Sequence, residues 1–258
     1  MPEWIEIEQA ATLAGLRVVL PPGIPGPWGE AIKGVLWVKK IPYINARHDL
    51  VNHAPLISWT KQASTPVLVY NDERPRSVWN DQINLAERIQ PSPPLVPESI
   101  DDRIAMFGLC NLLAGENGFG WLRRLMLVST MVEMSGSDPN ARKNALTFGS
   151  KYGYSPEAAT AAPGKCAEIL TGFSQRLAAQ RSRGIRYLVG DRLSAADIYW
   201  AAFAALVKPL PDELCPMLPR MRVLYDCKDR RVVDATSPEL LAHRDFIYRE
   251  HLELPVAL

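Results

Sequence analysis

The chain has 258 residues, of which 22% are charged and 47% apolar, a composition typical of folded globular proteins. Its 29 basic and 28 acidic residues nearly balance, which argues against a nucleic-acid or anionic-membrane partner. The longest apolar run, 198–207, is too short to cross a bilayer, and the first residues lack the basic segment of a secretory signal. No cysteine or histidine group has metal-ligand spacing. We therefore expect a soluble, cytoplasmic protein without a metal site.

The first ninety residues mix short apolar runs with amphipathic segments. This alternation predicts a small α/β unit. We expect strands at 16–20, 43–46 and 66–70, and helices at 30–40 and 78–89.

A proline-rich segment, QPSPPLVPES, follows at 90–99. Clustered prolines interrupt helices and strands, so this segment predicts a linker. We divide the chain into a domain at 15–90, a linker at 91–99 and a second domain at 100–258.

The second part of the chain has helical periodicity throughout. It predicts helices at 100–114 and 119–134, and another between Pro163 and Arg183. The spacing of Ser194 and Asp197 is typical of a capping box that opens a further helix. That helix has so few polar residues that it must be buried on all sides.

Three segments together resemble the glutathione transferase superfamily. They are TPVL at 65–68, LAERI at 85–89 before the linker, and GDRLSAADI at 190–198. The resemblance covers roughly residues 15–250 and implies α/β plus all-α architecture, with a thioredoxin-like N-terminal domain and an all-helical C-terminal domain. It also implies a homodimer that binds glutathione as cosubstrate and a small hydrophobic electrophile between the domains.

The resemblance implies a cis bond between Thr65 and Pro66, which proline makes inexpensive. Val67 would then pair through its main chain with the cysteinyl part of glutathione, as an added strand does. The alternative is a trans proline at the start of an edge strand.

The γ-glutamyl end of glutathione would bind within 73–80, where the family has an adjacent acid and serine. This chain has no such pair there. Ser77 is the best match, and the planar fork of Arg76 suits a carboxylate. The alternative is a solvated arginine beside a serine that caps the next helix.

The side chain that activates the thiol in this superfamily, a Tyr, Ser or Cys, has no counterpart here. No hydroxyl or thiol occurs between Ala14 and Tyr43. The backbone N–H groups of Trp28, Gly29 and Glu30, at a helix start, could stabilise a thiolate instead. We expect the Glu30 side chain to point to solvent.

Two other possibilities remain open at this position. The activating group could come from the loop before Thr65, where Asn52, His53 and Lys61 lie. Alternatively, the chain performs no thiol chemistry.

The second-substrate pocket implied by the resemblance would use Asn111, Glu116, Trp121 and Arg124, beside glycines that interrupt the helical pattern. These residues could also be exposed or face a dimer partner. The run 243–245 (HRD) is interpreted as a salt-bridge cluster on a helix surface.

Two functions follow from these observations. The first is a glutathione transferase-like enzyme for conjugation, thiol-dependent cleavage or isomerisation. The second is a non-catalytic protein of the same fold that binds a ligand or another protein.

Overall fold

The computed structural model describes residues 3–258 and begins with a four-stranded sheet whose strand order is β1-β3-β2-β4. Only β4 runs antiparallel to its neighbour. The strands are β1 (Trp4–Glu6), β2 (Leu16–Leu20), β3 (Ile44–Arg47) and β4 (Val67–Tyr70). The helices of this region are α1 (Ile7–Ala11), α2 (Pro27–Val38), α3 (Ala54–Thr60) and α4 (Trp79–Ile89).

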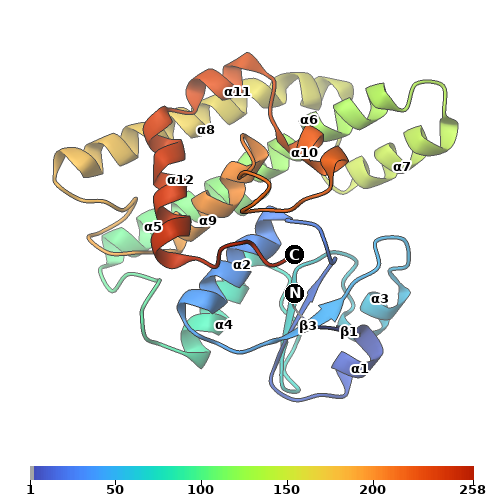
Figure 1. Cartoon of the computed structure of the whole chain (residues 1–258), viewed down its shortest axis with the longest axis horizontal. Helices are drawn as coiled ribbons and strands as arrows, with labels where there is room; N and C mark the ends of the chain where they lie inside the picture. Colours follow the sequence, from blue (N-terminus) through green and yellow to red (C-terminus); the bar gives the residue numbers. More distant parts are fainter. Residues whose placement is uncertain (1–2) are drawn as a thin grey trace.

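The sheet separates two sets of helices because neighbouring residues of a strand point to opposite faces. Val18, Leu20 and Leu68 face the core that contains α2 and α4, whereas Val19 and Val67 face the smaller core beneath α1 and α3. Figure 1 shows the resulting layers below the helical domain. The predicted strand at 16–20 is confirmed, but β1 and α1 were not predicted, since such short elements carry little periodicity.

The rest of the chain is helical. The helices are α5 (Ile100–Ala114), α6 (Phe119–Met134), α7 (Pro139–Ser150), α8 (Pro156–Ser182), α9 (Ala195–Phe203), α10 (Pro219–Tyr225), α11 (Arg230–Ala235) and α12 (Pro238–His251), and a 3₁₀ turn (Ala204–Leu206) extends α9. The predicted bounds of α5 and α6 are confirmed. Within residues 3–258, no helix has the length and apolarity needed to span a membrane.

Helix α8 begins at Pro156, earlier than predicted, and continues through Pro163. Proline removes one main-chain hydrogen bond from a helix interior. Here Ala159, Ala162 and Cys166 on the same stretch are buried, and α8 packs along α6. Burial of this face outweighs the break that the sequence pattern predicts at the proline.

Helix α9 is buried along its whole length and packs against α2, α5 and α12. Its predicted capping box is confirmed: Asp197 accepts hydrogen bonds from the Ser194 main-chain N–H at 3.0 Å and the Ser194 hydroxyl at 2.8 Å. Asp197 also accepts from the Leu188 N–H at 2.8 Å and contacts His243 Nε2 at 2.9 Å. One carboxylate therefore joins the loop before α9 to α12.

The predicted surface cluster at 243–245 is wrong. His243 and Arg244 are buried. His243 contacts Asp197, and Arg244 donates to the carbonyl of Lys208 besides pairing with Asp245. The cause is that α12 lies against α9, so this face of the helix meets the core instead of water.

Candidate functional site

The edge of the sheet where β2 ends and β4 begins is the place for the proposed tripeptide. The bond between Thr65 and Pro66 is cis, as predicted. Val19 lies opposite Val67 in the antiparallel ladder, so Pro66 and Thr65 follow beyond the last paired residues, beside the end of β2. Helix α2 begins after the loop that leaves this same edge.

The predicted main-chain role of Val67 is wrong. Leu68 exchanges hydrogen bonds of 2.9 and 2.8 Å with Arg76. Because main-chain groups alternate in direction along a strand, those of Val67 turn the other way, toward β2. Val67 is also fully buried. Thr65, two residues before Val67, lies beyond the last residue pair of β2 and β4, so its main-chain groups are the next that could face in the same direction.

The first turn of α2 offers two main-chain donors. The N–H groups of Trp28 and Gly29 have no partner among residues 3–258, as is usual at a helix start. The amide of Glu30 donates to the Gly26 carbonyl at 2.9 Å, so its predicted role as a free donor is wrong. The helix dipole makes the remaining pair attractive to an anion.

The Glu30 side chain does not point to solvent, contrary to the prediction. Its carboxylate lies 2.8 Å from the Lys33 ammonium, and its side chain is only 11% exposed. Burial raises the pKa of Glu30, although the Lys33 charge opposes the shift. The acid is thus enclosed beneath the C-terminal segment, since Lys33 also donates to the Ala257 carbonyl.

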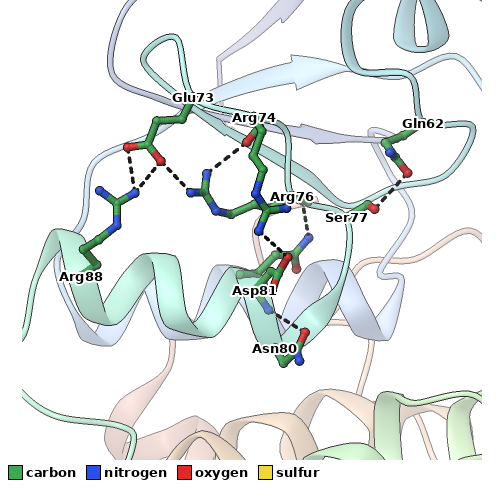
Figure 2. Close-up of polar contacts among 9 residues, drawn as sticks. Gln62, Glu73, Arg74, Arg76, Ser77, Asn80, Asp81 and Arg88 are labelled. Atoms are coloured by element: carbon green, nitrogen blue, oxygen red, sulfur yellow. Dashed lines mark hydrogen bonds and ion pairs between the residues drawn. The ribbon is translucent and has the colours of Figure 1, made fainter.

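The segment before α4 sends its side chains in two directions (Figure 2). The Ser77 hydroxyl donates to Gln62 Oε1 at 3.0 Å, near the edge that carries Thr65. Arg76 instead reaches Glu73 at 2.6 Å, where Arg88 also pairs. The carboxylate that Arg76 holds is therefore the chain's own, and Arg76 and Ser77 do not converge.

Ser77 is not the N-cap of α4. That position belongs to Val78, which makes no side-chain cap. The Ser77 hydroxyl bonds instead to Gln62, in the loop after α3.

The loop residues suggested as alternative activators are held locally. Lys61 donates to the Ser58 carbonyl, and Asn52 accepts from the Ala54 N–H. His53 Nδ1 lies 3.1 Å from His48 Nε2. His48, which no sequence motif singles out, is buried directly after β3. Its burial and the nearby His53 lower its pKa.

Trp28 connects the two domains. Its indole N–H donates to the Ala114 carbonyl at 2.9 Å, and its ring meets Phe203 edge-on at 4.9 Å between centroids. The Arg124 guanidinium lies 5.7 Å from the Trp28 ring centre. Trp28 is half-buried between the domains.

Two of the four residues predicted for a second-substrate pocket lie together. The Trp121 indole donates to the Tyr152 carbonyl at 3.0 Å, and Arg124 lies on the same helix, facing Trp28. Asn111 and Glu116 are exposed near the turn between α5 and α6. Neither forms a hydrogen bond or ion pair with Trp121 or Arg124 in the described part of the chain.

Gly120, in α6, lies against Phe203 of α9 and Trp28 of the first domain. A Cβ here would lie 2.4 Å from a Phe203 ring carbon and 2.9 Å from the Trp28 ring. We predict that Gly120→Ala lowers the free energy of unfolding by about 1–3 kcal/mol, because the buried Phe203 ring and the half-buried Trp28 ring must move. Urea unfolding measures this change.

The matched control is Gly172→Ala in α8, where a Cβ would meet nothing within 4 Å. Alanine at this helical position should stabilise the protein by about 0.5–1 kcal/mol. Equal effects of the two substitutions would show that the contact around Gly120 is not tight.

Comparison with known proteins identifies the fold. No family model and no curated protein matches the chain. A glutathione S-transferase from Methylobacterium radiotolerans, in complex with glutathione sulfonate, has a TM-score of 0.60 at 17% identity and covers 92% of each chain.

Two further solved structures are similar. A glutathione S-transferase from Methylobacillus flagellatus with glutathione bound has a TM-score of 0.61 at 14% identity, over 92% of this chain and 96% of that one. A rice transferase in complex with glutathione has a TM-score of 0.60 at 17% identity, over 94% and 93%. As the resemblance predicted, the chain has the fold of the glutathione S-transferases, a thioredoxin-like N-terminal domain joined to a helical C-terminal domain.

Proposed function

We propose that this protein binds glutathione at the edge of its sheet and presents the thiol to an electrophile held between the domains. The observation that carries the proposal is the pair of unpartnered amides, of Trp28 and Gly29, at the start of α2. The loop that leads to them leaves the end of β2, beside which Thr65 lies. Several solved structures of the same fold contain glutathione or its sulfonate, which supports the choice of ligand.

Each group at the edge has a separate role. The main chain of Thr65 extends the ladder and pairs with the cysteinyl part of the tripeptide. Ser77 and Gln62 supply a hydroxyl and an amide for the γ-glutamyl end. The amides of Trp28 and Gly29 face the sulfur and favour its thiolate form, because the positive end of a helix dipole stabilises an anion.

The thiolate is the nucleophile of the proposed reaction. It attacks an electrophilic carbon, and the bond that breaks next decides between conjugation, cleavage and isomerisation. In this scheme the helix start replaces the missing hydroxyl or thiol side chain.

Glutathione binding is the first test. Isothermal titration should give binding at millimolar affinity or better, and Ser77→Ala should weaken it about threefold to tenfold, the usual value of one hydrogen bond. Ser182→Ala is the matched control, because this exposed hydroxyl bonds only to the Ala179 carbonyl. Arg76→Ala should weaken binding less than Ser77→Ala.

The thiol pKa is the second test. Ultraviolet absorbance of the thiolate should show a lower pKa for bound than for free glutathione, whereas S-methylglutathione should bind without this signal. Binding with an unchanged thiol pKa would point to a non-catalytic ligand-binding protein. Absence of binding would overturn the proposal.

A further inference from the structure

Arg124 is a buried arginine without an acidic partner. It is 9% exposed, and no carboxylate lies within ion-pair distance of it among residues 3–258. Its Nε is buried with no hydrogen-bond partner in that part of the chain. Its hydrogen bond to the Tyr225 hydroxyl is long, at 3.5 Å. Burial of an uncompensated charge is costly, so such a group is rarely kept for stability alone.

The neighbouring Arg123, by contrast, uses its donors in hydrogen bonds within the protein. Its Nε donates to the Leu206 carbonyl at 2.8 Å, and Nη2 approaches the Tyr225 carbonyl at 3.5 Å. Arg123 therefore joins α6 to the chain around α9 and α10 by donating hydrogen bonds to main-chain carbonyl oxygens. Arg124 donates to no main-chain carbonyl in the described part of the chain.

Aromatic rings hold the Arg124 guanidinium in place. Its carbon lies 5.7 Å from the centre of the Trp28 ring and 5.6 Å from that of Tyr225, distances at which cation–π attraction acts. Helix α10, which ends at Tyr225, packs beside α6 (Figure 1). The rings fix the planar fork, whose Nε has no hydrogen-bond partner in the described part of the chain, while the hydroxyls of Tyr225 and Tyr152 act on the guanidinium.

The surroundings of Arg124 are positively charged. The Lys151 ammonium lies 5.4 Å from the centre of the Tyr152 ring. Partial burial and the Arg124 charge lower the pKa of Lys151 to about 8. The charge of Asp229 acts on the neighbouring Arg123, and this carboxylate is already paired with Arg231.

We infer that Arg124 binds a carboxylate on the second substrate, so that this substrate is an aromatic or otherwise apolar acid. The inference rests on the proposed function, since Trp28 places Arg124 next to the start of α2. A carboxylate accepts two parallel hydrogen bonds from a guanidinium fork, and the Trp28 and Tyr152 rings would contact the apolar body. Lys151 adds attraction at the exposed side of the site.

The experiment compares two unreactive probes, phenylacetate and phenylacetamide, by isothermal titration of the full-length protein. They have nearly the same shape and differ in charge. We expect phenylacetate to bind at least about tenfold more tightly than the amide, as charge-assisted hydrogen bonds favour the acid. Arg124→Met should remove the preference, and Arg124→Lys should keep part of it.

Arg192→Met is the control, because this arginine is exposed in the loop before α9. It should leave the preference unchanged. Should Arg124→Met fail to fold, the wild-type measurement still decides: equal affinities for the two probes, or no binding of phenylacetate, would overturn the inference. A rise in the Lys151 pKa from about 8 on phenylacetate binding, followed by NMR, would support it.

These probes need no glutathione. A protein that prefers phenylacetate but does not bind glutathione would retain the carboxylate site and lose the proposed transferase function. A protein that binds glutathione but binds the two probes equally would retain the proposed function and lose the carboxylate site.

Discussion

Replacing Asp197 with alanine should lower the free energy of unfolding by about 3–5 kcal/mol, the range expected when one partner of a buried pair is removed. The carboxylate is fully buried and accepts from the Leu188 N–H and from both the main chain and hydroxyl of Ser194. It also holds the buried His243. Alanine would leave these groups unpaired, at about 1–3 kcal/mol for each buried group. Urea unfolding measures the loss.

Asp191→Ala is the control from the same loop, because its side chain is 82% exposed. It should change stability by no more than about 0.5 kcal/mol. Asp197→Asn should fall between the two, since the amide keeps one acceptor oxygen but turns a donor toward existing donors. A loss below about 1 kcal/mol for Asp197→Ala would show that these hydrogen bonds do not hold the loop.

Replacing Lys39 with methionine is the second substitution with a large expected effect, about 3 kcal/mol of lost stability. The Lys39 side chain is 0% exposed, and its ammonium lies 2.9 Å from a Glu87 carboxylate oxygen. It also donates to the Gln90 carbonyl at 2.7 Å and the Pro93 carbonyl at 2.8 Å. Methionine keeps the apolar stem but leaves all three acceptors without this donor.

Lys40→Met is the matched control, because the adjacent lysine is exposed. The double substitution Lys39→Met with Glu87→Gln should recover part of the loss, since it removes the uncompensated carboxylate. Limited proteolysis should cut the linker faster in Lys39→Met alone. Unchanged cleavage there would contradict the role of Lys39 in fixing the linker to α2.

The elements that could be predicted from sequence are those with strong local signals. The buried run at 16–20, the helical periodicity of α5 and α6, and the box formed by Ser194 and Asp197 all depend on residues close in the chain. The short helices α1, α3 and α10 have too few turns to show a period. α8 was misjudged at Pro163 because packing outweighed the local preference against proline.

The candidate site was harder to predict because its residues come together only through the sheet register and the domain contact. The resemblance implied the cis bond at Pro66, and the sequence showed that no hydroxyl or thiol lies between Ala14 and Tyr43. It could not tell that Leu68 bonds to Arg76, and so it assigned to Val67 a main-chain role that the pairing of Val67 with Val19 excludes. The direction of main-chain groups depends on which strand lies alongside.

Charge environment likewise emerged only in three dimensions. In the sequence, Arg76 and Arg124 have the same capacity to bind a carboxylate. In the folded protein, Arg76 meets the chain's own Glu73, whereas Arg124 lies between aromatic rings and pairs with no acid among residues 3–258. The sequence by itself determined many of the helical and strand segments, because these depend on local preference and periodicity, and its three motifs implied the type of fold by resemblance. Only the tertiary structure decided which charged groups are already neutralised, because that depends on contacts between residues far apart in the chain.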